Sequence, residues 1–299
     1  MGKNMNIFIF GEVLFDVFES GEEKLGGAPF NVAWHLKGFG LDPIFISSIG
    51  SDKRGERIIS LMEKWQLNTE GVKIVEKYQT GIVNVYMDRK GPFFEIPFDQ
   101  AFDHISFEID KIKLNNSTAP LLYHGSLALR SENNIKTINS IKNILNPKIY
   151  IDINLRSPWW EISKIHSIIE DAHYLKLNNY EVFDIFHTNA NKDSLTKICK
   201  EYQLEWIILT RGEEGGNILT KEGIYLHARK ELEKTLVDTV GAGDAFAAVS
   251  IYGLLNNWEY QKILQRAVEF SAYICTIRGA LPENIDIYKN FLNEWEINE

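Results

Sequence analysis

Two glycines and a carboxylate stand together at Gly241, Gly243 and Asp244, beside an apolar run that predicts a helix over residues 245–255. The first N–H groups of a helix have no partner within it, and the helix dipole is positive there. Glycines let this backbone approach an anion, and an ionised Asp244 can accept the proton of a hydroxyl group. The pattern therefore indicates phosphoryl transfer to an alcohol. In the alternative interpretation, the glycines form a turn and Asp244 caps the helix.

Polar loops directly follow three of the predicted strands, and these loops are residues 178–181, 210–215 and 238–244. The third follows a short apolar pair, Leu236-Val237. The carboxyl ends of parallel strands lie along one edge of a sheet, and ligands bind in the crevice there. We therefore expect the three loops to converge although they are far apart in the sequence.

A fourth loop near the start of the chain carries Gly26, Gly27 and Asn31. The paired glycines predict a turn with a close backbone approach, and the amide of Asn31 offers a donor and an acceptor to a sugar diol. Asp16 is a carboxylate in an otherwise apolar run, residues 13–18. Strand alternation could simply point Asp16 at solvent, which is the simpler interpretation of that residue alone.

The composition argues against several classes of protein. The chain has 299 residues, is 44% hydrophobic and carries a formal net charge of −9. This charge argues against nucleic acid or an anionic membrane as a main partner, so local backbone donors and a few basic residues must build any phosphate site. The 2 cysteines lack a C-x-x-C pattern, and we find no targeting segment or membrane-length apolar run. These features predict a cytoplasmic protein.

Short apolar runs alternate with segments of helical periodicity along most of the chain. Several runs are continuously apolar, as expected for strands that are covered on both faces. The predicted strands are residues 6–10, 43–49, 121–124, 148–153, 174–177 and 205–209. This alternation predicts an α/β fold of three layers, α/β/α, in which a central, mostly parallel sheet lies between two layers of helices.

Two places interrupt this alternation. The residues after the first strand leave no room for a helix, and residues 81–87 and 92–97 predict a β-hairpin. We expect a small β-sheet lid, contributed by about 12–25 and 81–98, on one domain that spans 1–299; a plain edge hairpin is the alternative. A second subunit could cover the free edges of such a lid, which would give a homodimer.

The block Asp238-Thr239-Val240-Gly241-Ala242-Gly243-Asp244-Ala245-Phe246 resembles the late signature of the ribokinase-like (PfkB-type) carbohydrate kinases almost letter for letter. Three motifs precede this block in that family's order: the early glycine pair, the N-x-x-E at 178–181 and the T-x-G-x-x-G at 210–215. The resemblance therefore spans nearly the whole chain. It implies a ribokinase-like fold with a β lid. It also implies a kinase that uses ATP and Mg²⁺, with a small sugar as its other partner and neither nucleic acid nor membrane.

The same resemblance implies a role for each loop. Asp244 would accept the proton of the sugar hydroxyl. The N–H groups of the preceding turn would form an anion hole for the transferring phosphoryl group, namely those of Gly241, Ala242 and Gly243. The sugar would be bound by the lid strand and the early loop, at Asp16, Gly26, Gly27 and Asn31.

The remaining loops would hold the nucleotide and metal ions. The residues implied at the nucleotide are Asn178, Thr210, Gly212, Gly215 and Gly243. Asn178 and Glu181 would hold Mg²⁺ through water. The carbonyl groups near Asp238 and Val240, with the segment before Gly279, resemble the family's loop for a monovalent cation such as K⁺.

The acceptor sugar is indicated by a D-x-N-x-R motif, residues 152–156, with Trp160 four residues on. This motif resembles the branch of fructokinases and 2-keto-3-deoxygluconate kinases, and Gly11-Glu12 and residues 125–130 favour fructokinase. Arg156 could contact nucleotide phosphates or a sugar-acid carboxylate, or form a surface ion pair. We therefore predict a fructokinase. The alternatives are a kinase for 2-keto-3-deoxygluconate, ribose or a nucleoside, and, from another class, a non-catalytic sugar-binding regulator on the same fold.

Overall fold

The computed structural model describes residues 6–88, 91–108, 120–231 and 235–297. Within them, a 9-stranded sheet runs in the order β13-β12-β11-β10-β9-β8-β1-β4-β5. Its strands are β1 Ile7–Phe10, β4 Ile44–Gly50, β5 Val72–Val75, β8 Leu121–His124, β9 Lys148–Asp152, β10 Tyr174–Asn178, β11 Trp206–Thr210, β12 Gly216–Thr220 and β13 Tyr225–Ala228. The strands from β5 to β11 pair in parallel, and β12 and β13 add antiparallel strands at one edge. The predicted mostly parallel sheet is confirmed.

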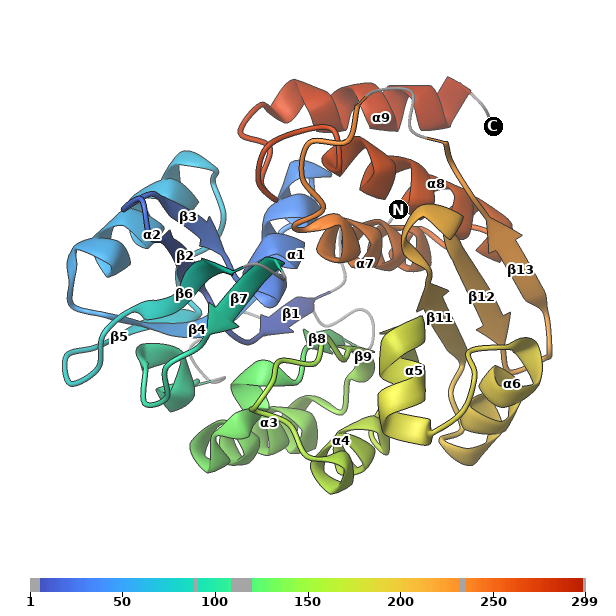
Figure 1. The fold of residues 1–299 in the computed structure, drawn as a ribbon, viewed down its shortest axis with the longest axis horizontal. Helices are drawn as coiled ribbons and strands as arrows, with labels where there is room; N and C mark the ends of the chain where they lie inside the picture. Colours follow the sequence, from blue (N-terminus) through green and yellow to red (C-terminus); the bar gives the residue numbers. More distant parts are fainter. Residues whose placement is uncertain (1–5, 89–90, 109–119, 232–234, 298–299) are drawn as a thin grey trace.

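Helices cover both faces of this sheet (Figure 1). One layer comprises α1 Ala28–Gly38, α2 Lys53–Lys64, α7 Ala242–Leu255, α8 Tyr260–Ile274 and α9 Ile285–Ile297. The other comprises α3 Glu132–Leu145, α4 Ile162–Ile169, α5 Asn179–Phe186 and α6 Lys192–Glu201. Alternate residues of β1 serve the two layers, because Ile7 and Ile9 join the core of α1 and α7 whereas Phe8 and Phe10 join that of α3. No helix in the described part of the chain is long and apolar enough to cross a bilayer.

A second, smaller sheet projects beside the first (Figure 1), and we call it the lid. It has 4 strands in the order β3-β2-β6-β7. They are β2 Leu14–Phe18, β3 Glu23–Gly26, β6 Gly81–Asp88 and β7 Gly91–Glu95. The predicted hairpin is confirmed as the antiparallel pair β6/β7, although residues 89–90 of its turn lie outside the described residues. Since β2 pairs with β6 and not with the central sheet, the lid is a separate sheet and not an edge hairpin.

The strand predicted at Leu236-Val237 is wrong. The N–H groups of Val237 and Asp238 both donate to the carbonyl oxygen of Cys275, at 2.9 and 3.2 Å, so this segment pairs with the end of α8 and not with the sheet. The helix that follows begins at Ala242, earlier than predicted, because Gly241 takes a left-handed conformation and serves as its N-cap. Helix packing, and not a strand, therefore carries the loop at 238–244 to the sheet edge.

Candidate active site

A cavity of about 550 Å³ lies between the lid and the carboxyl ends of β1, β9, β10 and β11, and we call it the central cavity. Most of the sequence-predicted site residues line it. They are Asp16, Gly26, Gly27, Asn31, Arg156, Asn178, Glu181, Thr210, Asp238, Val240, Gly241, Gly243 and Asp244. The tertiary structure thus brings together all four loops, although Asn31 and Asp244 alone are 213 residues apart in the sequence.

Asp244 lies in the first turn of α7, buried in the wall of the central cavity. The Nδ2 group of Asn31, in the first turn of α1, donates a hydrogen bond to its Oδ2 at 2.7 Å. Burial raises the pKa of Asp244 to about 6, although the bond from Asn31 and the charge of Lys176 lower it. Because Gly241 is the N-cap of α7, Asp244 is not the cap of this helix. Its carboxylate can instead accept a proton at neutral pH.

The turn before Asp244 packs closely on the segment near Gly279. Gly241 has a φ of 79°, and a Cβ at this position would lie only 2.3 Å from the Cβ of Ala280. Asp238 ties the same two segments, because its carboxylate accepts the N–H groups of Val240 at 3.1 Å and Gly279 at 3.2 Å. The two segments that the family resemblance linked are thus in contact, and a side chain larger than that of glycine would clash in the turn between them.

Among the described residues, the Ala242 N–H group predicted for the anion hole has a hydrogen-bond partner. The N–H of Ala242 donates to the carbonyl oxygen of Thr239 at 3.3 Å, a long hydrogen bond. Ala242 also lines a neighbouring cavity and not the central one. Gly241 and Gly243 therefore present the turn's backbone to the central cavity.

Glu12 is a cavity residue that the sequence analysis used only for its family resemblance. It follows β1, its side chain is buried in the cavity wall, and Oε2 has no hydrogen-bond partner within the described residues. Burial raises its pKa to about 7, a shift that the charge of Arg156 reduces. The only sequence signal was an acidic residue at the end of an apolar strand, which is also typical of solvent-exposed loops.

Asp16 faces the central cavity from the lid strand β2, so the simpler interpretation of an outward-pointing side chain is wrong. Burial raises its pKa to about 6, and the charges of Arg156 and Lys24 oppose that rise. The neighbouring loop passes very close to the segment after β1, since a Cβ on Gly27 would lie 2.6 Å from the carbonyl oxygen of Glu12. The close approach predicted for the glycine pair is therefore present at Gly27.

The N-x-x-E motif forms the capping box of α5. The side-chain oxygen of Asn178 accepts the N–H groups of Tyr180 and Glu181, both at 2.9 Å. The carboxylate of Glu181 accepts the N–H groups of Asn178 at 2.8 Å and Leu155 at 3.0 Å. Burial raises the pKa of Glu181. The motif thus has a structural use, and its carboxylate oxygens keep lone pairs on the cavity side for a hydrated cation.

A buried ion pair that the sequence analysis missed lies beside the glycine turn. Nζ of Lys176, on β10, is 2.9 and 2.8 Å from the two carboxylate oxygens of Asp152, at the end of β9. The two side chains are 7% and 3% exposed. The available signal was a lysine inside an otherwise apolar strand. A lysine at such a position can equally lie at an end of the strand that is exposed to solvent.

A second cavity of about 490 Å³ adjoins the central one, and we call it the side cavity. Both cavities are lined by Thr210, Thr239 and Gly243. The predicted nucleotide residues Gly212 and Gly215 line only the side cavity, together with apolar side chains of α7 and α8. The glycine turn therefore stands where the two cavities meet.

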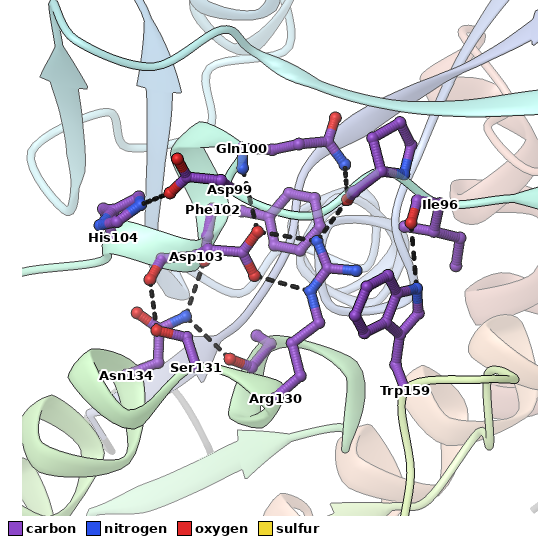
Figure 2. Close-up of polar contacts among 12 residues, drawn as sticks. Ile96, Asp99, Gln100, Phe102, Asp103, His104, Arg130, Ser131, Asn134 and Trp159 are labelled. Carbon is purple, nitrogen blue, oxygen red and sulfur yellow. Dashed lines mark hydrogen bonds and ion pairs between the residues drawn. The ribbon is translucent and has the colours of Figure 1, made fainter.

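The base of the lid is fixed by the buried guanidinium of Arg130 (Figure 2). Nε and Nη2 each donate to the carboxylate of Asp103 at 2.7 Å, and Nη2 also donates to the carbonyl oxygen of Pro97, at the end of the lid, at 2.7 Å. The guanidinium carbon lies 4.4 Å from the ring centre of Trp159, whose indole N–H donates to the carbonyl oxygen of Ile96. The segment that leaves β7 is thereby held to the core beneath the central cavity.

Comparison with known proteins gives the same fold and a family. A structure of a fructokinase double mutant from Vibrio cholerae has a TM-score of 0.81 at 19% identity, over 97% of this chain and 99% of that one. Probable fructokinase-5 of Arabidopsis thaliana is 27% identical, over 94% of this chain and 95% of its own length. The ATP-dependent 6-phosphofructokinase of Thermoanaerobacterium thermosaccharolyticum is 25% identical, over 95% and 92%.

The family model described as pfkB family carbohydrate kinase matches residues 10–286. The match begins at the last residue of β1 and ends in the first turn of α9, so it includes the lid, the glycine turn and every residue of the central cavity described above. This chain therefore belongs to the pfkB family of carbohydrate kinases, and it is an ATP-dependent sugar kinase.

Proposed function

We propose that this protein is a fructokinase, which transfers the γ-phosphoryl group of ATP to a hydroxyl group of fructose. The observation that carries the proposal is the polar wall of the central cavity, where Glu12, Asp16, Asn31 and Asp244 gather. Carboxylates and amides accept hydrogen bonds from the hydroxyl groups of an uncharged sugar, whereas an acidic or phosphorylated sugar would be repelled by three of these four side chains.

The arrangement suits an in-line transfer. Asp244 would accept the proton of the sugar hydroxyl. At the same time the hydroxyl oxygen would bond to the γ-phosphorus, and the bond from that phosphorus to the leaving ADP would break. The backbone of Gly241 and Gly243, at the positive end of α7, would stabilise the charge on the transferring group. The side cavity would hold the nucleoside, whose phosphates would pass Thr210 and Gly243 into the central cavity. These roles are supported by the position of the glycine turn between the two cavities.

Two cations are part of the proposal. Glu181, with Asn178, offers the hard oxygen ligands that fit Mg²⁺. Water would bridge the contact, because each carboxylate oxygen of Glu181 already accepts one backbone N–H group. When bound, Mg²⁺ would neutralise charge on the phosphates. The carbonyl groups near Asp238 and Val240, which lie against the segment at Gly279, would hold K⁺. The Vibrio cholerae fructokinase double mutant was solved with fructose, ADP and potassium ion, which supports both the sugar and the monovalent cation.

A kinase for 2-keto-3-deoxygluconate is the second candidate, because Arg156 lines the central cavity and could pair with a sugar-acid carboxylate. Its charge lowers the pKa of Glu12, Asp16 and Asp244, so it acts across the whole cavity. For fructose, the same arginine would face the nucleotide phosphates.

The test is ADP release from Mg-ATP with fructose, fructose 6-phosphate, 2-keto-3-deoxygluconate, ribose and adenosine, each with and without K⁺. We expect fructose to give the highest kcat/KM, and Asp244→Ala to abolish most of kcat with little change in KM. A preference for 2-keto-3-deoxygluconate would select the second candidate. Fructose binding in a calorimeter without ADP release would instead support a sugar-binding regulator.

A further inference from the structure

Lys176 occupies an unusual position for a buried lysine. It lies on β10, in the middle of the central sheet, and its side chain is only 7% exposed, yet it lines the central cavity. A Cβ added to Gly243 would be 3.5 Å from its Nζ atom, so the ammonium group stands directly beside the glycine turn. A positive charge is thereby fixed at the point where the two cavities meet.

Asp152 determines where this charge lies. Its two carboxylate oxygens are 2.9 and 2.8 Å from Nζ of Lys176, and the hydroxyl of Tyr123 donates to one of them at 3.4 Å. Both carboxylate oxygens are thus used, whereas an ammonium group has three donors and keeps one for another acceptor. The two short contacts pair the ammonium group with a buried carboxylate beside the glycine turn.

We propose that Lys176 is a catalytic residue, whose ammonium group contacts the transferring phosphoryl group at the glycine turn, and that Asp152 is its positioning residue. This proposal rests on the proposed function and adds to it a side chain from the sheet that offsets the phosphoryl charge. A fixed cation in a buried site costs little reorganisation during the reaction, which is why such groups stabilise a transition state more than water does. Three carboxylates act on Lys176 from other elements of the fold: Asp152 on β9, Glu181 on α5 and Asp244 on α7.

The test compares Lys176→Met, Lys176→Arg and the double variant Lys176→Met/Asp152→Asn with the wild type. The double variant matters because the single loss of Lys176 leaves a buried carboxylate unpaired, which alone can prevent folding. We expect the folded double variant to lose about 100-fold or more in kcat for ADP release with the preferred sugar, with a small change in the KM of that sugar. Lys176→Arg should recover part of the loss, because it restores a cation.

A binding measurement separates this proposal from the proposed function. Adenosine and the β,γ-imido analogue of ATP are titrated calorimetrically, in the presence of Mg²⁺, into the wild type and the double variant. We expect the variant to bind adenosine as the wild type does and to bind the analogue at least tenfold more weakly. This comparison does not depend on the identity of the sugar, so it holds even if the wild type phosphorylates none of the sugars offered.

The control is Lys142→Met, which removes a lysine paired with Asp171 at 2.8 Å on the far helix layer. It should leave kcat and both affinities unchanged. The proposal is overturned if the folded double variant keeps kcat within about threefold of the wild type. It is equally overturned if adenosine, the analogue and the sugar all lose affinity together, because Lys176 and Asp152 would then be a purely structural pair.

Discussion

Asn31 and Asp244 are 213 residues apart in the chain, yet Nδ2 of Asn31 donates a hydrogen bond to Oδ2 of Asp244 at 2.7 Å. Each residue lies in the first turn of a helix, α1 and α7, so the bond joins two helix N-termini at the cavity wall. The other amide atom of Asn31, Oδ1, is buried without a hydrogen-bond partner among the described residues. Asn31 can therefore orient the carboxylate of Asp244 through Nδ2 and still accept a hydrogen bond from a hydroxyl group at Oδ1.

This bond predicts a shift in the pH dependence of turnover. Asp244 must be ionised to accept a proton, so the rate should fall as the pH decreases through its pKa of about 6. The bond from Asn31 lowers that pKa, so Asn31→Leu should raise it and move the acid limb of kcat/KM to higher pH. Steady-state rates between pH 5 and 8 would measure the limb, with the exposed Asn68→Leu as control. An unmoved limb in Asn31→Leu would show that this bond does not set the titration.

We predict that removing the charge of Glu12 stabilises the folded protein. Burial raises its pKa from 4.5 to about 7, so the charged form is disfavoured in the folded state. That cost is absent below about pH 4.5, grows between the two pKa values and is complete above pH 7, where it reaches about 3 kcal/mol. Glu12→Gln should therefore stabilise the protein in urea at pH 8 and make little difference at pH 4. The exposed Glu63→Gln is the matched control, and an equal effect at both pH values would contradict the prediction.

For a substitution at Gly241 in the glycine turn, Gly223 is a matched control. Both have a left-handed φ, 79° and 85°, but a Cβ at Gly241 would strike Ala280 whereas nothing lies within 4 Å at Gly223. Each alanine variant should lose about 1 kcal/mol for the backbone conformation. Gly241→Ala should lose more, and kcat should fall with it because the turn must move away from the cavity. Thermal unfolding and ADP release check this; equal behaviour of the two variants would mean that the contact with Ala280 is unimportant.

We predict that Arg130 links the stability of the core to sugar binding at the base of the lid. Arg130→Met leaves the buried carboxylate of Asp103 without its guanidinium, which should destabilise the protein by about 3–5 kcal/mol. Arg130→Met/Asp103→Asn should recover much of that loss. Both variants also remove the bond to Pro97, so the sugar KM should rise in the double variant even where stability is regained. Urea unfolding and sugar titrations measure the two effects. A double variant as unstable as the single one would show that the pairing is not the cause.

The sequence alone determined the features that depend on neighbouring residues. The apolar runs predicted the central strands, the glycine turn with Asp244 predicted an anion site at a helix end, and the hairpin at 81–97 predicted the lid. These are local properties, because hydrophobic periodicity and glycine conformations act over a few residues. The parallel order of the strands then followed from the alternation of strands and helices.

Where the sequence failed, the physical cause was distant in the chain. Leu236-Val237 is not a strand because its hydrogen-bond acceptor, Cys275, comes from the end of α8. Strand β3 escaped prediction because its short, partly charged run takes its conformation from pairing with β2. A local pattern cannot identify a partner that only folding supplies.

Only the tertiary structure decided the chemistry of the cavity wall. Asp16 faces the cavity because the lid turns that side of β2 toward the central sheet, and Glu12 is buried where the early loop packs against it. Lys176 is held beside the glycine turn by a carboxylate on the neighbouring strand. The residue types are written in the sequence, but burial and neighbouring charges set their protonation, and both arise only when distant segments pack together.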